Sequence, residues 1–135
     1  MKIIKKMKKI YTILLAISFL FIGVAAYAQG LDGVTAGLKS GNAVQITNNS
    51  GVNLLLTIAD KGGNYNKQQA QQMLKGFFDK NAVKTFEIKH KGDSPNGRFA
   101  IGTLTTANGN YRVNIFMKTE DGKELLKELR FQLIE

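Results

Sequence analysis

The side chains that could support catalysis are few in this chain. His90 is the single histidine and there is no cysteine, which excludes the usual zinc-site spacings. No carboxylate is identifiable as a partner that would orient His90 as a general base, so we interpret it as a half-solvated residue at the rim of the fold. Ser94 has no partner that suggests a nucleophile, and Gly62-Gly63 is a turn rather than a phosphate-binding loop. We therefore predict no catalytic residues, no metal site and no cofactor.

The N-terminal segment predicts export. Five lysines lie within residues 2–9, an apolar stretch covers residues 10–25, and Ala26 and Ala28 supply small side chains for a signal peptidase. This order is typical of a cleaved secretory signal peptide, and we predict cleavage before Gln29. A membrane anchor would need about 20 apolar residues, and this run is shorter. We expect a periplasmic or secreted protein with no membrane attachment after cleavage.

Cleavage of the leader would lower the net charge of the protein. The whole chain has 19 Lys and Arg against 10 Asp and Glu, and five of the bases lie in residues 1–28, so the mature chain has 14 bases and a net charge of +4. The bases are scattered, which argues against a nucleic-acid-binding surface. Without cysteine there is no disulfide and no lipidated N-terminal residue. Residues 29–135 should therefore fold as one domain on a hydrophobic core alone.

Hydrophobic periodicity predicts two helices, one short helical turn and one strand in the first half of the mature chain. A helix begins at Leu31 and stops at Ser40-Gly41-Asn42, and residues 43–46 continue the helical layer. The apolar run 52–59 predicts a strand covered on both faces, followed by a loop at residues 60–64. The clearest element is a helix over 67–78, for which Asn66 and Gln69 have the spacing of a capping box.

From residue 83 onward the apolar period is two, which predicts strands. Phe86, Ile88 and His90 form an inward row, and a second strand covers residues 98–106. Asn108-Gly109 predicts a two-residue hairpin loop. The inner face of the second strand then carries its small and apolar residues, and Tyr111 of the following strand also faces inward.

The length of the last turn is predicted from the residues that each possible pairing of its strands would bury. A two-residue loop at Asp121-Gly122 would set Ile115 against Glu128 and bury charge, so we predict a three-residue loop, 120–122, with a bulge. That register places four apolar residues together on the outer face, which needs a cover. They are Phe99, Ile101, Phe116 and Leu126.

The predicted architecture is α+β: helix, strand, helix and a four-stranded antiparallel meander curled around the helices as a cone. Several motifs resemble a family of small exported bacterial proteins, domain of unknown function 4783, within the nuclear transport factor 2-like (cystatin-like) superfamily. They cover essentially the whole mature chain and are Ser40-Gly41-Asn42-Ala43, the helix 67–78, Phe86-x-Ile88-x-His90-x-Gly92, residues 99–104, and Asn108-Gly109-x-Tyr111-Arg112-Val113.

The resemblance implies the fold but not the function, because the family has no established activity and its superfamily includes both enzymes and non-catalytic domains. Two hypotheses remain open. The favoured one is a non-enzymatic exported domain that forms a homodimer or binds a partner protein through the outer sheet face. The alternative is a pocket inside the cone, built from Tyr65, His90 and Tyr111, that binds a small apolar ligand or acts as a weak isomerase or hydrolase.

Overall fold

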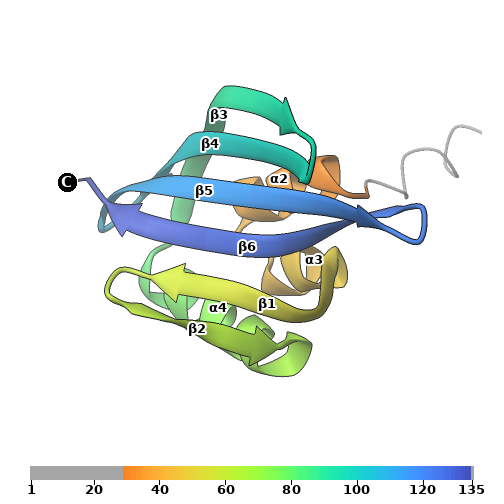
Figure 1. Ribbon diagram of the computed structural model, residues 1–135. Helices are drawn as coiled ribbons and strands as arrows, with labels where there is room; N and C mark the ends of the chain where they lie inside the picture. Colours follow the sequence, from red (N-terminus) through yellow and green to blue (C-terminus); the bar gives the residue numbers. More distant parts are fainter. Residues whose placement is uncertain (1–28, 135) are drawn as a thin grey trace, which may run out of the picture.

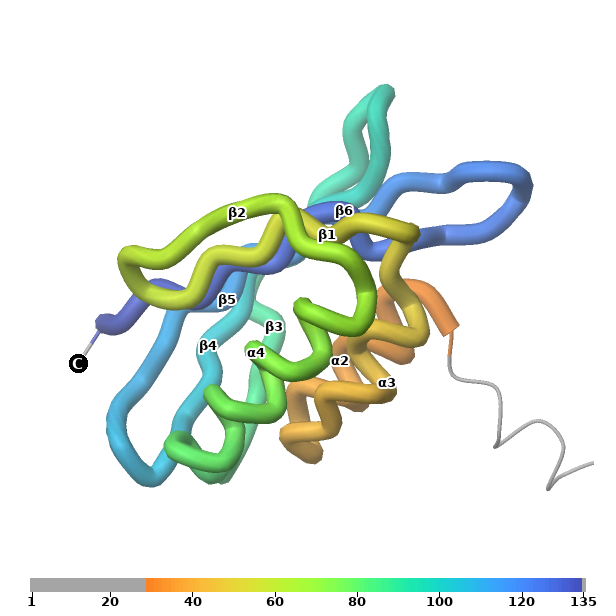
Figure 2. The backbone as a smooth tube through the Cα atoms, turned by 90° about the horizontal axis from the view of Figure 1, so that it is seen from below, coloured from red at the N-terminus to blue at the C-terminus, as the bar shows by residue number. Residues whose placement is uncertain are grey.

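Three helices cover one face of a curved sheet in the computed structural model, which describes residues 29–134. The other face of the sheet carries no helix in this part of the chain (Figures 1 and 2). The predicted leader, 1–28, lies outside the described residues. The elements are α2 (Leu31–Ser40), α3 (Ala43–Asn48), β1 (Ser50–Ile58), β2 (Lys61–Asn66), α4 (Lys67–Lys80), β3 (Val83–Ser94), β4 (Gly97–Thr106), β5 (Gly109–Glu120) and β6 (Lys123–Leu133).

The predicted helices are confirmed, and α3 and α4 each run two residues beyond their predicted ends, to Asn48 and Lys80. α2 ends at Gly41, which adopts the left-handed conformation with a φ of 65°. α4 has the predicted capping box: the Asn66 side chain accepts from the Gln69 amide at 2.8 Å, and the Gln69 side chain accepts from the Asn66 amide at 3.3 Å. No helix among residues 29–134 is both long and apolar enough to span a membrane.

The hydrophobic core lies between the helices and the inner face of the sheet. Leu38 of α2, Ile46 of α3 and Leu74 of α4 are all fully buried there, as are Leu56 of β1 and Leu129 of β6. Burying one such side chain contributes about 1.5–3 kcal/mol. The helices and strands therefore stabilise each other through one shared core.

The prediction of a loop at residues 60–64 is wrong, because most of this segment forms the edge strand β2. It pairs antiparallel with β1, and the turn between them takes only Ala59 and Asp60. Its two glycines have low strand propensity and hide the strand from sequence analysis. The described sheet has six strands in the order β2-β1-β6-β5-β4-β3, with β1 and β6 parallel and the other neighbours antiparallel.

β1 is covered on one face only, so the prediction that residues 52–59 are buried on both faces is also wrong. Leu54 and Leu56 are fully buried, but Leu55 between them is 42% exposed and Val52 is 82% exposed. The apolar run of β1 therefore adds uncovered apolar surface to the molecule.

The hairpin between β4 and β5 turns one residue earlier than predicted. Thr106 pairs with Gly109, so the two-residue loop ends at Asn108. The Thr106 hydroxyl donates to the Gly109 carbonyl at 2.8 Å and accepts from the Asn108 amide at 3.1 Å. Each residue of β4 therefore pairs with a residue of β5 two positions earlier than the predicted loop would give. A shift of two positions leaves every side chain on its predicted face. The predicted inner face of β4 is confirmed, with Ala100 and Leu104 fully buried.

The turn between β5 and β6 is the two-residue loop that the prediction rejects. Asp121 and Gly122 adopt positive φ values of 51° and 77°, as a type I′ hairpin requires. A regular ladder beyond this loop would bury charge. The structure avoids that conflict with a bulge, because the pairing changes between Met117 and Phe116 and leaves Lys127 as an extra residue on β6.

This bulge decides which residues of β6 face the helices. Leu126 pairs with Met117, and after Lys127 the inward row continues with Leu129 and Phe131. All four apolar residues are fully buried. The predicted position of Leu126 on the outer face is therefore wrong, because the extra residue lies inside the strand and not in the loop.

A second bulge moves His90 to the outer face. Phe86 is buried and Ile88 packs against the core, as predicted. The ladder to β4 then shifts by one residue at Lys89, so that His90 pairs with Ile101. Directly opposed residues share a face, and His90 is exposed there. Its predicted position in the inward row is wrong.

Candidate functional site

The outer face of the sheet brings together three of the four residues predicted for an interface. They are Phe99, Ile101 and Phe116, which we call the outer patch. Phe99 lies directly opposite Phe116 in the β4–β5 ladder, and Ile101 follows on the same face of β4. Phe99 is 40% exposed, and the other two side chains are partly exposed. Leu126, the fourth predicted residue, lies in the core.

Two glycines let backbone approach the rings of the outer patch. Gly92 of β3 pairs with Phe99, and a Cβ added at Gly92 would overlap the Phe99 ring. A Cβ at Gly97 would lie 3.1 Å from the Phe116 ring and would overlap the Met117 carbonyl. The aromatic rings therefore lie close over the sheet instead of standing away from it.

Charged side chains of both signs surround the outer patch. The strand registers place Glu128 directly opposite Phe116, and Leu55 lies beyond Glu128 on β1. The carboxylate of Glu87 is paired with the Lys89 ammonium at 3.1 Å. By register the outer face carries three acids, Glu87, Glu120 and Glu128, and four bases, Arg112, Lys118, Lys123 and Arg130.

The structure does not bring the three predicted pocket residues together. Tyr65 lies on β2 and His90 on β3, which are the opposite edges of the sheet. His90 is also on the outer face, whereas Tyr65 and Tyr111 both pack against the core on the inner face. Tyr111 and His90 line two different hollows.

Aromatic rings fill the space between α4 and the sheet. The ring centroid of Phe77 lies 4.8 Å from that of Phe131 and 5.0 Å from that of Tyr111, and Phe78 lies 6.3 Å from Phe131. Within residues 29–134 no carboxylate or histidine is buried, and no group of three acidic or histidine side chains is placed to hold a metal ion. The buried polar residues are Thr47, Ser50 and Thr106.

A pocket of about 410 Å³ opens beside Tyr111, and we call it the Tyr111 pocket. The Tyr111 hydroxyl donates to Asn81 Oδ1 at 3.4 Å, and Asn81 Nδ2 donates to the Phe77 carbonyl at 3.0 Å. No sequence motif marks this pocket, because its walls come from three separate parts of the chain. They include Ile58 and Lys61 from the first hairpin, and Met73, Gly76 and Lys80 from α4.

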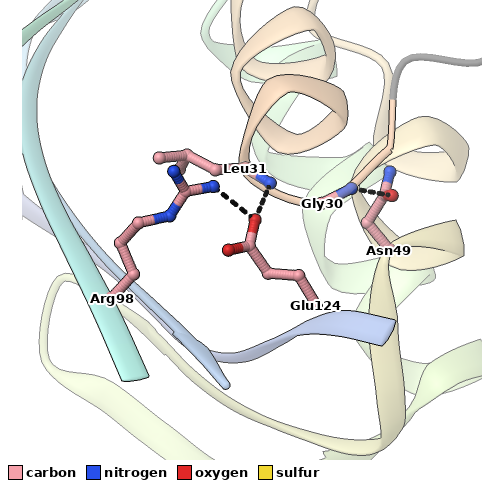
Figure 3. Close-up of polar contacts among 5 residues, drawn as sticks. All are labelled: Gly30, Leu31, Asn49, Arg98 and Glu124. Carbon is pink, nitrogen blue, oxygen red and sulfur yellow. Dashed lines mark hydrogen bonds and ion pairs between the residues drawn. The ribbon is translucent and has the colours of Figure 1, made fainter. Parts of the chain in front are cut away.

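A polar cluster at the start of α2 is a feature that sequence analysis misses (Figure 3). Glu124 Oε1 accepts from the Leu31 amide at 2.7 Å and from the Arg98 guanidinium at 2.6 Å, and Asn49 Oδ1 accepts from the Gly30 amide at 3.0 Å. Gly30 has a φ of 65°, and a Cβ there would overlap the Glu124 side chain. The cluster therefore fastens the first turn of α2 to β4 and β6.

The electrostatics of this cluster keep both of its ionisable groups charged. The hydrogen bond with Glu124 raises the pKa of Arg98, against the effect of burial. Burial acts to raise the pKa of Glu124, but the hydrogen bonds from Arg98 and from the Leu31 amide outweigh it and hold this pKa below its usual value. The interacting residues are 26 and 93 positions apart, so no local motif predicts the contact. We assign the cluster a structural role.

Solved structures identify the fold. A nuclear transport factor 2-like protein of unknown function from Cytophaga hutchinsonii ATCC 33406 matches with a TM-score of 0.54 and 10% sequence identity, over 75% of this chain and 83% of that chain. At this identity the likeness shows the fold alone. The predicted nuclear transport factor 2-like (cystatin-like) fold is confirmed. No curated protein matches the chain.

More similar structures identify the family. A DUF4783 family protein from Bacteroides uniformis ATCC 8492 has a TM-score of 0.74 and 30% identity, over 78% of this chain and 97% of that chain. Another, from Bacteroides fragilis YCH46, has a TM-score of 0.71 and 35% identity, over 75% and 95%. The family model called domain of unknown function (DUF4783) matches residues 31–132. The resemblance is thus confirmed: the chain belongs to the DUF4783 family.

Proposed function

We propose that this protein is an exported, non-enzymatic domain that forms a homodimer through the outer face of its sheet. The observation that carries the proposal is the outer patch, in which Phe99 is directly opposite Phe116 and remains 40% exposed. Aromatic residues at the centre of a sheet face, with polar residues around them, are typical of protein interfaces. The second copy of the chain is the partner that we favour.

The charges around the outer patch favour a second copy over an unrelated partner. In a two-fold dimer each face meets itself, so the face must be complementary to its own charges. The outer face carries charges of both signs, so that Glu128 can face Arg112 or Arg130 of the other copy. A face with charges of one sign would repel itself.

The interior supports a non-catalytic role. General acid–base catalysis requires a titratable group within reach of a bound substrate, and the space inside the cone is occupied by Phe77, Phe78 and Phe131. His90 is exposed on the other face. The export part of the proposal rests on the leader sequence alone, and an N-terminus at Gln29 in secreted protein would support it.

The experiment compares Phe116→Asp with the wild type, using the mature chain 29–135. Light scattering over a dilution series should show a wild-type dimer and a monomeric variant. We expect dimerisation to weaken at least about 100-fold, because a carboxylate would lose its water at the centre of the interface.

The matched control is Val44→Asp, which replaces an exposed apolar residue with the same charge in α3, on the helix side of the sheet. It should remain a dimer. A wild type that is monomeric at every concentration would contradict the proposal, and so would a Phe116→Asp variant that dimerises as well as the wild type.

A further inference from the structure

We propose that the Tyr111 pocket binds a small amphiphile that has an apolar chain and an anionic headgroup, such as a medium-chain carboxylate. The pocket lies on the helix side of the sheet, and the outer patch lies on the other side. This inference therefore goes beyond the proposed dimer and does not depend on it.

The floor of the pocket is apolar apart from the hydrogen-bonded pair of Tyr111 and Asn81, and Gln72 also lines the pocket. Ile58, Met73 and Tyr111 are partly buried hydrophobic residues that pack against the core, and Phe77 lies beneath them. The polar atoms at the floor already pair with each other, since Tyr111 donates to Asn81 and Asn81 donates to the Phe77 carbonyl. A volume of about 410 Å³ lies within the usual range for small-molecule pockets.

Gly76 keeps the pocket open. It lies inside α4, where glycine is less favourable than alanine, and it lines the pocket. A Cβ added at Gly76 would meet no atom within 4 Å. The absence of a side chain here therefore leaves one wall of the pocket uncovered, and a larger residue has room to fill the space.

The charges at the rim select an anionic headgroup. Lys61, from the β1–β2 turn, and Lys80, at the end of α4, both line the pocket, and none of the lining residues is acidic. Asp79 is next to Lys80 in sequence but lines a different hollow on the other side of α4. Three other hollows on the described chain each include an aspartate or a glutamate. The Tyr111 pocket thus combines an apolar floor with two lysines and no acidic lining residue, and Asp60 is next to Lys61 in the turn.

The first experiment titrates the mature chain with decanoate, decan-1-ol and octanoate by calorimetry. Decanoate should bind, decan-1-ol should bind at least tenfold more weakly because it lacks the charge, and octanoate should bind about tenfold more weakly because it buries two fewer methylene groups. The absence of decanoate binding would overturn the proposal. Equal affinities for decanoate and decan-1-ol would overturn the assignment of the headgroup.

The second experiment uses three substitutions of Gly76 and one double variant of the two rim lysines. Gly76→Leu should fill the pocket and weaken decanoate binding at least tenfold, whereas the control Gly76→Ala should preserve binding. Both should melt at or above the wild-type temperature, because both residues favour a helix; Gly76→Phe repeats the test with a larger side chain. Lys61→Gln combined with Lys80→Gln should reduce the affinity for decanoate to that for decan-1-ol.

Two further outcomes decide the assignment. A folded Gly76→Leu or Gly76→Phe variant that binds decanoate as well as the wild type would place the ligand elsewhere and overturn the proposal. The Phe116→Asp variant should bind decanoate normally, so failure of the dimer and failure of the pocket are separate results.

Discussion

The two faces of the sheet use the same strands but differ in how their apolar residues are covered. On the inner face Leu104, Val113 and Leu129 are fully buried under the helices. On the outer face Phe99 and Leu55 are each about 40% exposed and have charged neighbours. The stability of the single chain therefore comes from the inner face, while the apolar residues of the outer face remain available for binding.

Deletion of Arg130 tests how the two faces are assigned. Without this residue, the regular ladder beyond the bulge would set Phe131 against Asn114 on the outer face and Gln132 against Val113 in the core. We expect a loss of more than about 5 kcal/mol, which approaches the whole stability of a small domain. Urea unfolding followed by circular dichroism would measure it.

The control for this deletion is the deletion of Lys127, which removes the extra residue of the bulge and a surface ion pair with Glu120 of 2.8 Å. The ladder then becomes regular with Leu129 and Phe131 still facing the helices, and exposed ion pairs contribute little, so this variant should unfold close to the wild type. If the Arg130 deletion were as stable as the Lys127 deletion, the register would not determine the faces of β6.

A pair of phenylalanine substitutions tests the energetic difference between the faces. Phe131→Ala removes a fully buried ring that contacts two other rings and should cost about 3–5 kcal/mol. Phe99→Ala removes a ring that is 40% exposed and should cost less than about 1 kcal/mol in the single chain. Both are best measured by urea unfolding at low protein concentration, where dimerisation contributes least. Equal losses would show that the outer patch also stabilises the single chain.

The smallest predicted effect concerns the polar cluster that holds α2 over the inner face. Glu124→Gln should cost about 1 kcal/mol at neutral pH, because Glu124 is partly exposed and its bonds to Arg98 and Leu31 become weaker. The folded pKa of Glu124 lies below its usual value, so its contribution is complete above the unfolded pKa of about 4.3 and is lost as the pH falls through the folded pKa.

Unfolding experiments in urea from neutral to acidic pH would measure this dependence. The difference between the wild type and Glu124→Gln should be constant above about pH 5 and should shrink at lower pH. A difference that grows on acidification would contradict the assigned direction of the pKa shift.

Much of the fold is predictable from local sequence. The helix α4 is an example, because its apolar stripe and the capping pair of Asn66 and Gln69 involve residues within a few positions of each other. The alternation of apolar and polar residues along β4 and β5 likewise predicts which side chains of β4 face the helices. This holds even though the hairpin turns one residue earlier than predicted. Three residues of the outer patch follow from the same alternation.

The remaining features depend on contacts between distant segments. A bulge within β6 moves Leu126 to the core and another within β3 moves His90 to the outer face, and neither has a local signature, since both depend on the partner strand. The Tyr111 pocket and the Glu124 cluster likewise join separate segments of the chain.

Residue types and short spacings are enough to predict the helices, the strand-rich second half, the family and the lack of cysteine chemistry. The covered faces of the sheet and its open hollows are fixed by contacts that form on folding. One extra residue in a strand reverses the direction of every side chain after it, and the energy that selects its position comes from packing across the sheet.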